Sequence, residues 1–316
     1  MNSARFLVCS VFLAALLASS GSASAQLRTF VASTGSDSNP CSRVAPCRTF
    51  QGAVNATAAG GEVVALDSAG FGPNVTINKA ISIIASPGVY AAVTVSSGDG
   101  ISISAGPNDI VTLRGLTVDS SGSNGSGIAN QTAAALHIEN CVISGFNPGV
   151  GGIVQRASGQ LFVKDTIVKN NGKGIFLASF TAGSTLVTLD NVTITDNNFG
   201  LFVHASNSGQ IEAAIIRSSI SGNITGGVGV EGSDAGTAFL DIESCLITNN
   251  GANNGAGVEV VELLGSAAAS ISNCLISHNS TAGFNVGPGT AIFSRGNNTI
   301  IGNGPNTGSL TALAGQ

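Results

Sequence analysis

The chain has 316 residues and few charges: 12 Lys and Arg against 17 Asp and Glu give a formal net charge of −5 at pH 7. This composition supplies no basic surface, so we expect no nucleic-acid partner. Its 43 glycines and its frequent Asn, Ser, Thr, Val and Ile suit many short strands joined by tight turns.

The N-terminus has the features of a secretory signal. Arg5 is followed by the apolar run 6–18 and by small residues that end in Ala23-Ser24-Ala25, an Ala-x-Ala cleavage pattern. The apolar run is shorter than the about 20 residues of a membrane span. We therefore expect residues 1–25 to be removed and the mature chain to be secreted, periplasmic or extracellular, without membrane insertion.

Cys41 and Cys47 bracket the short segment SRVAP. In a secreted chain this spacing predicts a disulfide that closes a small N-terminal loop, with two free thiols as the alternative.

The remaining chain repeats a short unit, in which an asparagine follows an apolar residue by three positions. These asparagines recur every 24 to 29 residues. They are Asn171, Asn197, Asn223, Asn250, Asn279 and Asn303. A period in this range predicts a stack of repeats, each of which buries its apolar face against its neighbours.

Each unit also contains a tract such as Ile138-Glu-Asn-Cys141-Val-Ile143, with apolar residues first and last and a small or apolar residue between them. The alternation of the last three residues predicts a strand, and the first and middle residues both face inward only if the chain bends between them. Further tracts begin at Leu113, Val163, Leu189, Ile215, Ile242 and Ile271.

A second strand follows each asparagine, usually after a glycine. Three short strands per turn without a helical segment predict an all-β fold, a right-handed parallel β-helix of about ten turns. A leucine-rich repeat is the alternative, but β-branched residues dominate here and glycine interrupts the place of its convex segment.

The asparagine column is expected to be structural. Asparagine tolerates left-handed backbone, which suits a sharp bend. Amides stacked about 4.8 Å apart can also hydrogen-bond along the column. Cys141, Cys245 and Cys274 share the middle inward column, so we expect buried free thiols there.

Three segments carry a resemblance to a known family: TFVASTGSDSNPC at 29–41, APCRTFQ at 45–51 and GEVVALD at 61–67. They resemble the opening of secreted pectin-lyase-like β-helix proteins, and the repeat N-C/T-x-I-x-x-N-x-x-G-I is similar to the turn unit of that family. The resemblance implies a short capping helix, here at residues 49–59. We divide the chain into a signal at 1–25, an N-terminal region at 26–60, the β-helix at 61–304 and a C-terminal tail at 305–316.

The family includes polysaccharide lyases, hydrolases and epimerases as well as members of unassigned activity. Its lyases use clustered aspartates for calcium and an arginine base, and its hydrolases use Asp pairs and Gly-His-Gly. This sequence has neither Asp-Asp nor Gly-His-Gly, and Asp165 and Asp190 fall in adjacent columns. We therefore expect no metal site and no cofactor.

Arg114, Glu139, Lys164 and Asp190 alternate in sign along one outward column. They suit either a catalytic strip with Lys164 or Arg114 as base or, as we favour, an ion ladder that avoids repulsion between stacked charges.

The second-strand face holds the candidate binding residues. Phe176 and Phe202 share a column with Glu259, and His204 adjoins Glu231 in the next outward column. An aromatic step beside a His/Glu pair can bind a sugar ring, or His204 and Glu231 can perform acid–base chemistry. The alternative is that loop 178–186 or insertion 250–257 covers the phenylalanines. His137 and His278 are expected at strand ends or turns without clear partners.

We therefore expect a monomeric secreted β-helix protein that binds extracellular or cell-surface polysaccharide, with catalysis uncertain. One alternative is a polysaccharide lyase, hydrolase or epimerase with a different acid–base site. The other is a structural or adhesive spacer.

Overall fold

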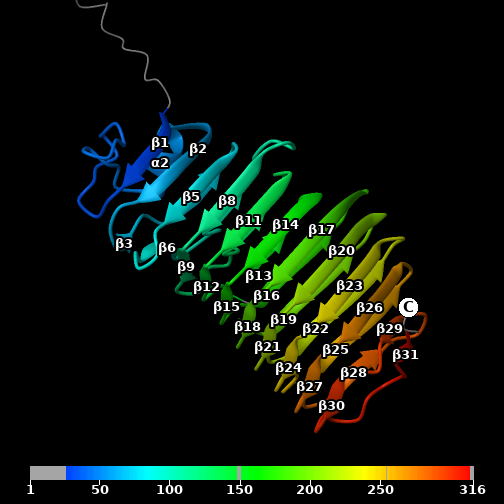
Figure 1. Cartoon of the computed structure of the whole chain (residues 1–316). Coiled ribbons are helices and arrows are strands. Elements are labelled where there is room, and N and C mark those ends of the chain that lie inside the picture. Colours follow the sequence, from blue (N-terminus) through cyan, green and yellow to red (C-terminus); the bar gives the residue numbers. More distant parts are fainter. Residues whose placement is uncertain (1–25, 148–150, 254, 314–316) are drawn as a thin grey trace, which may run out of the picture.

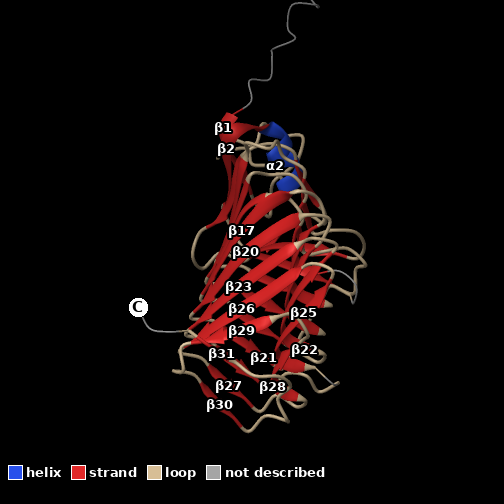
Figure 2. Cartoon of the chain, turned by 90° about the vertical axis from the view of Figure 1, so that its right-hand side faces the viewer, coloured by secondary structure: helices blue, strands red, loops and turns tan. Residues whose placement is uncertain are grey.

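The computed structural model describes residues 26–147, 151–253 and 255–313, and the expected signal at 1–25 lies outside them. Parallel strands form three long sheets that wind together as an elongated solenoid, from β1 and α2 at one end to β30 and β31 at the other (Figure 1). The view turned by 90° shows the sheets side by side around a common interior (Figure 2).

Sheet A has twelve strands within the described residues. In spatial order these are β1 (Gln26–Val31), β2 (Thr57–Ala65), β5 (Ile81–Ala85), β8 (Ile110–Arg114), β11 (Ala135–Glu139), β14 (Gly159–Lys164), β17 (Gly183–Asp190), β20 (Gly209–Ile216), β23 (Thr237–Glu243), β26 (Ser266–Ser272), β29 (Ala291–Ser294) and β31 (Thr311–Ala312). β31 pairs with β29, so the expected C-terminal tail adds a strand to this sheet.

Sheet B has ten short strands in the described part of the chain. They are β3 (Ala69–Gly70), β6 (Ala91–Val95), β9 (Leu116–Ser120), β12 (Val142–Ser144), β15 (Ile167–Lys169), β18 (Thr193–Thr195), β21 (Ser219–Ser221), β24 (Leu246–Thr248), β27 (Leu275–Ser277) and β30 (Thr299–Ile301).

Sheet C has nine described strands, so the solenoid has about nine complete turns, one fewer than the repeat predicted. They are β4 (Val75–Ile77), β7 (Ile101–Ile103), β10 (Ile128–Asn130), β13 (Gly151–Gln155), β16 (Lys173–Ser179), β19 (Phe199–Ala205), β22 (Gly226–Ser233), β25 (Ala256–Leu263) and β28 (Ala282–Val286).

The bend between sheets A and B confirms the column pattern. Ile138, Cys141 and Ile143 are all at most 1% exposed, although the first two are three residues apart. Asn140, directly before Cys141, has a left-handed backbone with φ of 51°. The same conformation recurs at Asp165, Asn191, Arg217, Ser244 and Asn273. One left-handed residue at each A-to-B bend therefore redirects the chain while both flanking side chains enter the core.

The ladder asparagines are structural because their amides hydrogen-bond along the column, but they do not supply the left-handed backbone of the bend. The left-handed residue at the B-to-C bend is the one before each ladder position: Asn170, Asp196, Gly222, Asn249, His278 and Gly302. The prediction that the ladder asparagines themselves adopt this backbone was wrong. Their side chains must point into the interior, so the sharp turn falls on the preceding residue.

The four inner ladder amides, Asn197, Asn223, Asn250 and Asn279, each accept two hydrogen bonds and donate two, as Asn223 illustrates. Asn223 Oδ1 accepts from the backbone N–H of Asn197 and from its Nδ2, both at 3.1 Å. Asn223 Nδ2 donates to Asn250 Oδ1 at 2.9 Å and to the carbonyl oxygen of Ile194 at 3.2 Å. The ladder thus pairs its own polar groups and two backbone groups per turn, all of them in the interior.

The N-terminal helix α2 (Phe50–Ala56) is shorter than the expected 49–59. Thr49 is its N-cap, with Oγ1 accepting from the backbone N–H of Gly52 at 3.0 Å. Thr57 ends it, since its backbone is extended and starts β2 and its hydroxyl contacts that of Thr29 at 2.7 Å.

The cysteines divide as the sequence indicated. Cys41 and Cys47 form a disulfide. Cys141, Cys245 and Cys274 are free and at most 3% exposed. Burial raises the pKa of Cys141 to about 11. A hydrogen bond with Cys274, together with burial, raises the pKa of Cys245 as well.

Removing one ladder amide should destabilise the protein. Asn223→Ala removes the described acceptor of the buried N–H of Asn197 and one donor to the carbonyl oxygen of Ile194, so we expect the unfolding free energy to fall by about 1–3 kcal/mol. Denaturant unfolding measures it. Asn198→Ala is the control, because Asn198 is half-buried and its side chain makes no hydrogen bond within the described residues. Equal stability of the two variants would contradict the role of the ladder.

The three free thiols should resist alkylation in the folded protein, because each is at most 3% exposed and the reagent cannot reach it. For Cys274 burial is the only protection, since its hydrogen bond with Cys245 lowers its pKa to about 7. Iodoacetamide at about pH 8, below the pKa of Cys141, should leave Cys141, Cys245 and Cys274 unmodified until denaturant is added, as mass spectrometry of the peptides would show. Rapid native labelling would mean that the middle column does not face the core.

Candidate functional site

The repeat predicts that the five candidate site residues lie within three consecutive turns, but they lie on four successive strands of sheet C, β16, β19, β22 and β25. Phe176 on β16 is in register with Phe202 on β19, and the same column continues through Gly229 on β22 to Glu259 on β25. His204 is in register with Glu231 in the next outward column. The repeat therefore placed each of them at the correct position.

The aromatic residues form a surface cluster. The rings of Phe176 and Phe202 stack with centroids 5.8 Å apart and planes at 26°, and both are half-buried. Phe199 meets Phe202 edge-on at 5.4 Å. Phe180, 40% exposed in the turn after β16, lies beside Phe176 at 6.3 Å and beside His204 at 5.3 Å. The turn thus flanks the cluster and leaves Phe202 partly open to solvent.

Two glycines on β22 make room for the rings of β19. A Cβ at Gly229 would lie 2.8 Å from Phe202 Cδ2 and 2.9 Å from Phe199 Cζ, and one at Gly226 would lie 2.8 Å from Phe199 Cε2. The rings therefore lie over glycine backbone. Beside them is a hollow of about 160 Å³. Its lining residues are Phe199, Phe202, Gly229, Val230, Glu231, Glu259 and Val261.

The polar groups of the site interact in pairs. His204 Nε2 is 3.1 Å from Ser233 Oγ and 3.7 Å from Glu231 Oε1, so two oxygens approach the same ring nitrogen. Glu259 Oε1 accepts a hydrogen bond from Asn285 Nδ2 at 2.8 Å. The expected His204/Glu231 neighbours are thus in contact, although an ion pair forms only when His204 is protonated.

Sequence reasoning missed Lys173, Phe180, Phe199 and Ser233. Lys173 Nζ lies 5.0 Å from the ring centroid of Phe176 and 5.9 Å from that of Phe202, a cation–π geometry. Phe180 was only part of a loop expected as a possible cover. Lys173 and Phe199 could have been found from the strand register, because they are in register with each other three residues before Phe176 and Phe202.

The charged column of sheet A forms only part of the expected ion ladder. Its register is as predicted, and Arg114 pairs with Glu139 at 2.8 Å. Asp190, however, pairs with Arg217 at 2.6 Å rather than with Lys164. Arg217 occupies the left-handed bend one turn further on, which allows its long side chain to reach back to Asp190.

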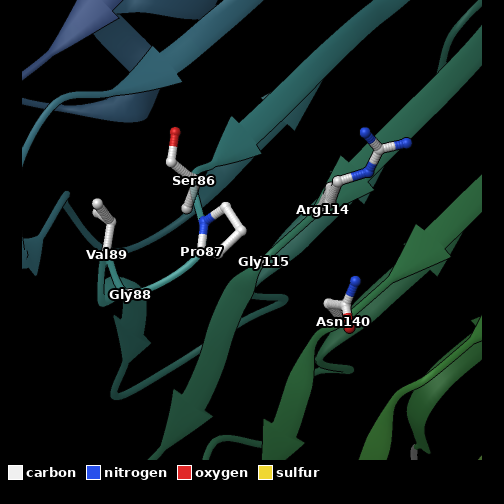
Figure 3. A pocket seen from close by; sticks show the side chains of 8 residues that line it. Ser86, Pro87, Gly88, Val89, Arg114, Gly115 and Asn140 are labelled. Carbon is white, nitrogen blue, oxygen red and sulfur yellow. The ribbon is translucent and has the colours of Figure 1, made fainter.

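A second hollow, of about 360 Å³, adjoins Arg114. Figure 3 shows Ser86, Pro87, Gly88 and Val89 on one side and Arg114 and Asn140 on the other. Because Nε and a terminal nitrogen of Arg114 are both held by Glu139, the guanidinium acts as an ion-pair partner here. This contact favours the ladder over a catalytic strip.

The described residues contain no group of three or more His, Cys, Asp and Glu side chains placed to hold a metal ion. Asp165 Oδ1 accepts from Asn191 Nδ2 at 2.7 Å, whereas Asp190 faces Arg217. The two aspartates therefore have separate partners.

One expectation about the remaining histidines was wrong. His137 lies in the middle of β11 and stacks on Phe162 of β14, with centroids 4.7 Å apart and planes at 18°. The two residues are in register on neighbouring strands, which brings their rings face to face. His278 is exposed at the B-to-C bend, as expected for a turn.

A family model described as right handed beta helix region matches residues 81–240. The chain belongs to this family. Among solved structures, the β-helix is similar to pectate lyase Pel9A at 15% identity and a TM-score of 0.56, over 91% of this chain and 78% of that one. At this identity the likeness shows the fold alone.

A rhamnogalacturonan lyase aligns at 14% identity over 84% of this chain and 72% of that one, but its TM-score of 0.37 supports no argument. No curated protein matches the β-helix chain. Within its described residues, the structure contains no helix long and apolar enough to cross a membrane.

A larger side chain at position 229 should displace the rings of Phe199 and Phe202 in the aromatic cluster. We expect Gly229→Val to shift the NMR resonances of Phe199 and Phe202 and to lower the unfolding free energy by about 1 kcal/mol through overpacking. Gly70→Val is the control, because a Cβ at Gly70 meets nothing within 4 Å. Unchanged ring resonances in Gly229→Val would mean that the rings do not lie over this glycine.

Proposed function

We propose that this protein binds an extracellular or cell-surface polysaccharide on sheet C, without catalysing its breakdown. The contact face consists of Phe176, Phe202, His204, Glu231 and Glu259. The observation that carries the proposal is the partly exposed Phe176/Phe202 stack beside a hollow lined by two carboxylates.

The chemistry of this face suits a sugar. An aromatic ring can cover the apolar face of a pyranose, and the carboxylate oxygens of Glu231 and Glu259 can accept hydrogen bonds from its hydroxyls. A polymer can follow the stack, since equivalent positions recur with each strand about 4.8 Å further along.

The fold supports polysaccharide as the ligand only by analogy with a similar structure. The similar structure named above is a pectate lyase by its title. Because one fold hosts many functions, this likeness favours polysaccharide as the ligand but assigns no reaction. We favour binding because Ser233 and Glu231 both approach Nε2 of His204, and none of the described residues places an orienting carboxylate at the other ring nitrogen.

We also propose that the protein is secreted. The signal expected at 1–25 and the Cys41–Cys47 disulfide both suit secretion into an oxidising compartment. We further propose that α2 caps the solenoid through its buried Phe50, Ala53 and Val54. A covered first turn opposes edge-to-edge stacking between copies and so favours a monomer.

The test is glycan retention by Phe202→Ala. A glycan array on residues 26–316 identifies a ligand, and titration then measures its affinity. We expect Phe202→Ala to weaken binding by about 1–2 kcal/mol, the scale of one lost aromatic contact. Phe162→Ala is the matched control, because Phe162 is also half-buried and stacked but belongs to sheet A.

Two results would overturn the proposal. If no glycan is retained, or if Phe202→Ala and Phe162→Ala retain it equally well, the sheet C face is not the binding site. If the protein releases products from a uronate polymer and His204→Ala abolishes this release, the protein is an enzyme.

A further inference from the structure

The acidic end of the sheet C hollow, formed by Glu231 and Glu259, has no lysine or arginine paired with it among the described residues. His204 is the only described ion-pair partner of Glu231, at 3.7 Å and only when protonated, and the described partner of Glu259 is the neutral amide of Asn285. The hollow is therefore anionic.

Lys173, the lysine of the aromatic cluster, lies against the phenylalanine rings and forms no described ion pair with either carboxylate. Lys173 Nζ is closer to the ring of Phe176, at 5.0 Å, than to that of Phe202, at 5.9 Å. Phe176 does not line the hollow. Lys173 is thus engaged by the aromatic faces and leaves the two carboxylates uncompensated.

The two carboxylates can converge on one group. Glu259 is in register with Gly229, two residues before Glu231 on the adjacent strand. Strand spacing and rise per residue put their backbones roughly 8 Å apart. Two side chains of this length can both reach a cation placed between them.

From this geometry we propose that the hollow selects an amine-bearing sugar, a hexosamine with a free ammonium group, as one unit of the bound polysaccharide. The ring lies against Phe202, and the ammonium lies between Glu231 and Glu259. This inference rests on the proposed function and names the ligand class of the same site.

The size of the hollow fits this occupant. At about 160 Å³, it is smaller than the roughly 300–1,000 Å³ of pockets that enclose drug-sized ligands. One pyranose ring can enter, and the rest of the polymer lies along the strands.

Charge also decides between the possible sugars. A uronate would bring a third carboxylate to a site that already has two, and like charges repel. A neutral sugar can still stack on Phe202 but gains no charge-assisted hydrogen bond. The hexosamine alone satisfies both the aromatic and the acidic part of the hollow.

The experiment compares short oligosaccharides of equal length, by titration on residues 26–316 at about pH 7, where ordinary Glu side chains are ionised and ordinary His side chains are mostly neutral. The three probes are glucosamine oligomers with free amines, the same oligomers N-acetylated, and oligogalacturonate. We expect the free-amine oligomer to bind about tenfold tighter than its acetylated form, the effect of one charge-assisted hydrogen bond. This advantage should shrink as salt shortens the screening length from about 30 Å at 0.01 M to about 8 Å at 0.15 M.

Matched variants separate the site from general attraction to an acidic protein. Glu231→Gln and Glu259→Gln should each reduce the free-amine preference and leave binding of the acetylated oligomer nearly unchanged. Glu212→Gln removes an exposed carboxylate from sheet A and should have no effect. Circular dichroism of each variant checks that the fold is retained.

The outcomes distinguish this inference from the proposed function. If an acetylated or uronate oligomer binds as tightly as the free amine and its binding still depends on Phe202, the amine preference is overturned and the glycan site stands. Equal losses in Glu212→Gln and Glu259→Gln would also overturn the preference. If no oligomer binds through Phe202, both proposals fall.

Discussion

The asparagine ladder determines the geometry of sheet C. At each turn, a glycine of the second strand packs against the ladder amide of the next turn. A Cβ at Gly174, Gly200, Gly227 or Gly257 would lie 2.7 to 3.0 Å from the Nδ2 of that amide. Side chains are therefore excluded there, and the amides can remain hydrogen-bonded to one another through the interior. The ladder and these glycines together fix where β16, β19, β22 and β25 begin.

The candidate site inherits its alignment from this contact. Phe176, Phe202, Gly229 and Glu259 each lie two residues after a ladder-contacting glycine. Their distances from the ladder asparagine differ, because the loop after Asn250 is longer than those after Asn171 and Asn197. The register is nevertheless preserved from β16 to β25. Insertions thus change the loops without shifting the column.

The sequence allowed the columns to be predicted but not the directions of long side chains. Period and alternation were enough to place His204 beside Glu231 and Arg114 beside Glu139, because parallel stacking in register leaves little choice. They could not show that Asp190 pairs with Arg217, since this contact joins a strand to a bend and depends on side-chain torsions. The inclusion of Phe180 in the cluster depends likewise on the conformation of a turn.

The hollow exists because the aromatic column is interrupted. A third phenylalanine after Phe176 and Phe202 would extend the stack and pack against the exposed side of Phe202. Gly229 stands there instead, and the rings of β19 lie over its backbone. The next position in the column is a carboxylate, Glu259, held from the far side by Asn285. The absence of a side chain at Gly229 thus leaves the hollow open. Phe199 and Phe202 form its aromatic wall, and Glu231 and Glu259 form its acidic wall. In a solenoid this is the simplest way to form a hollow, since one residue can change while the backbone of every turn stays in place.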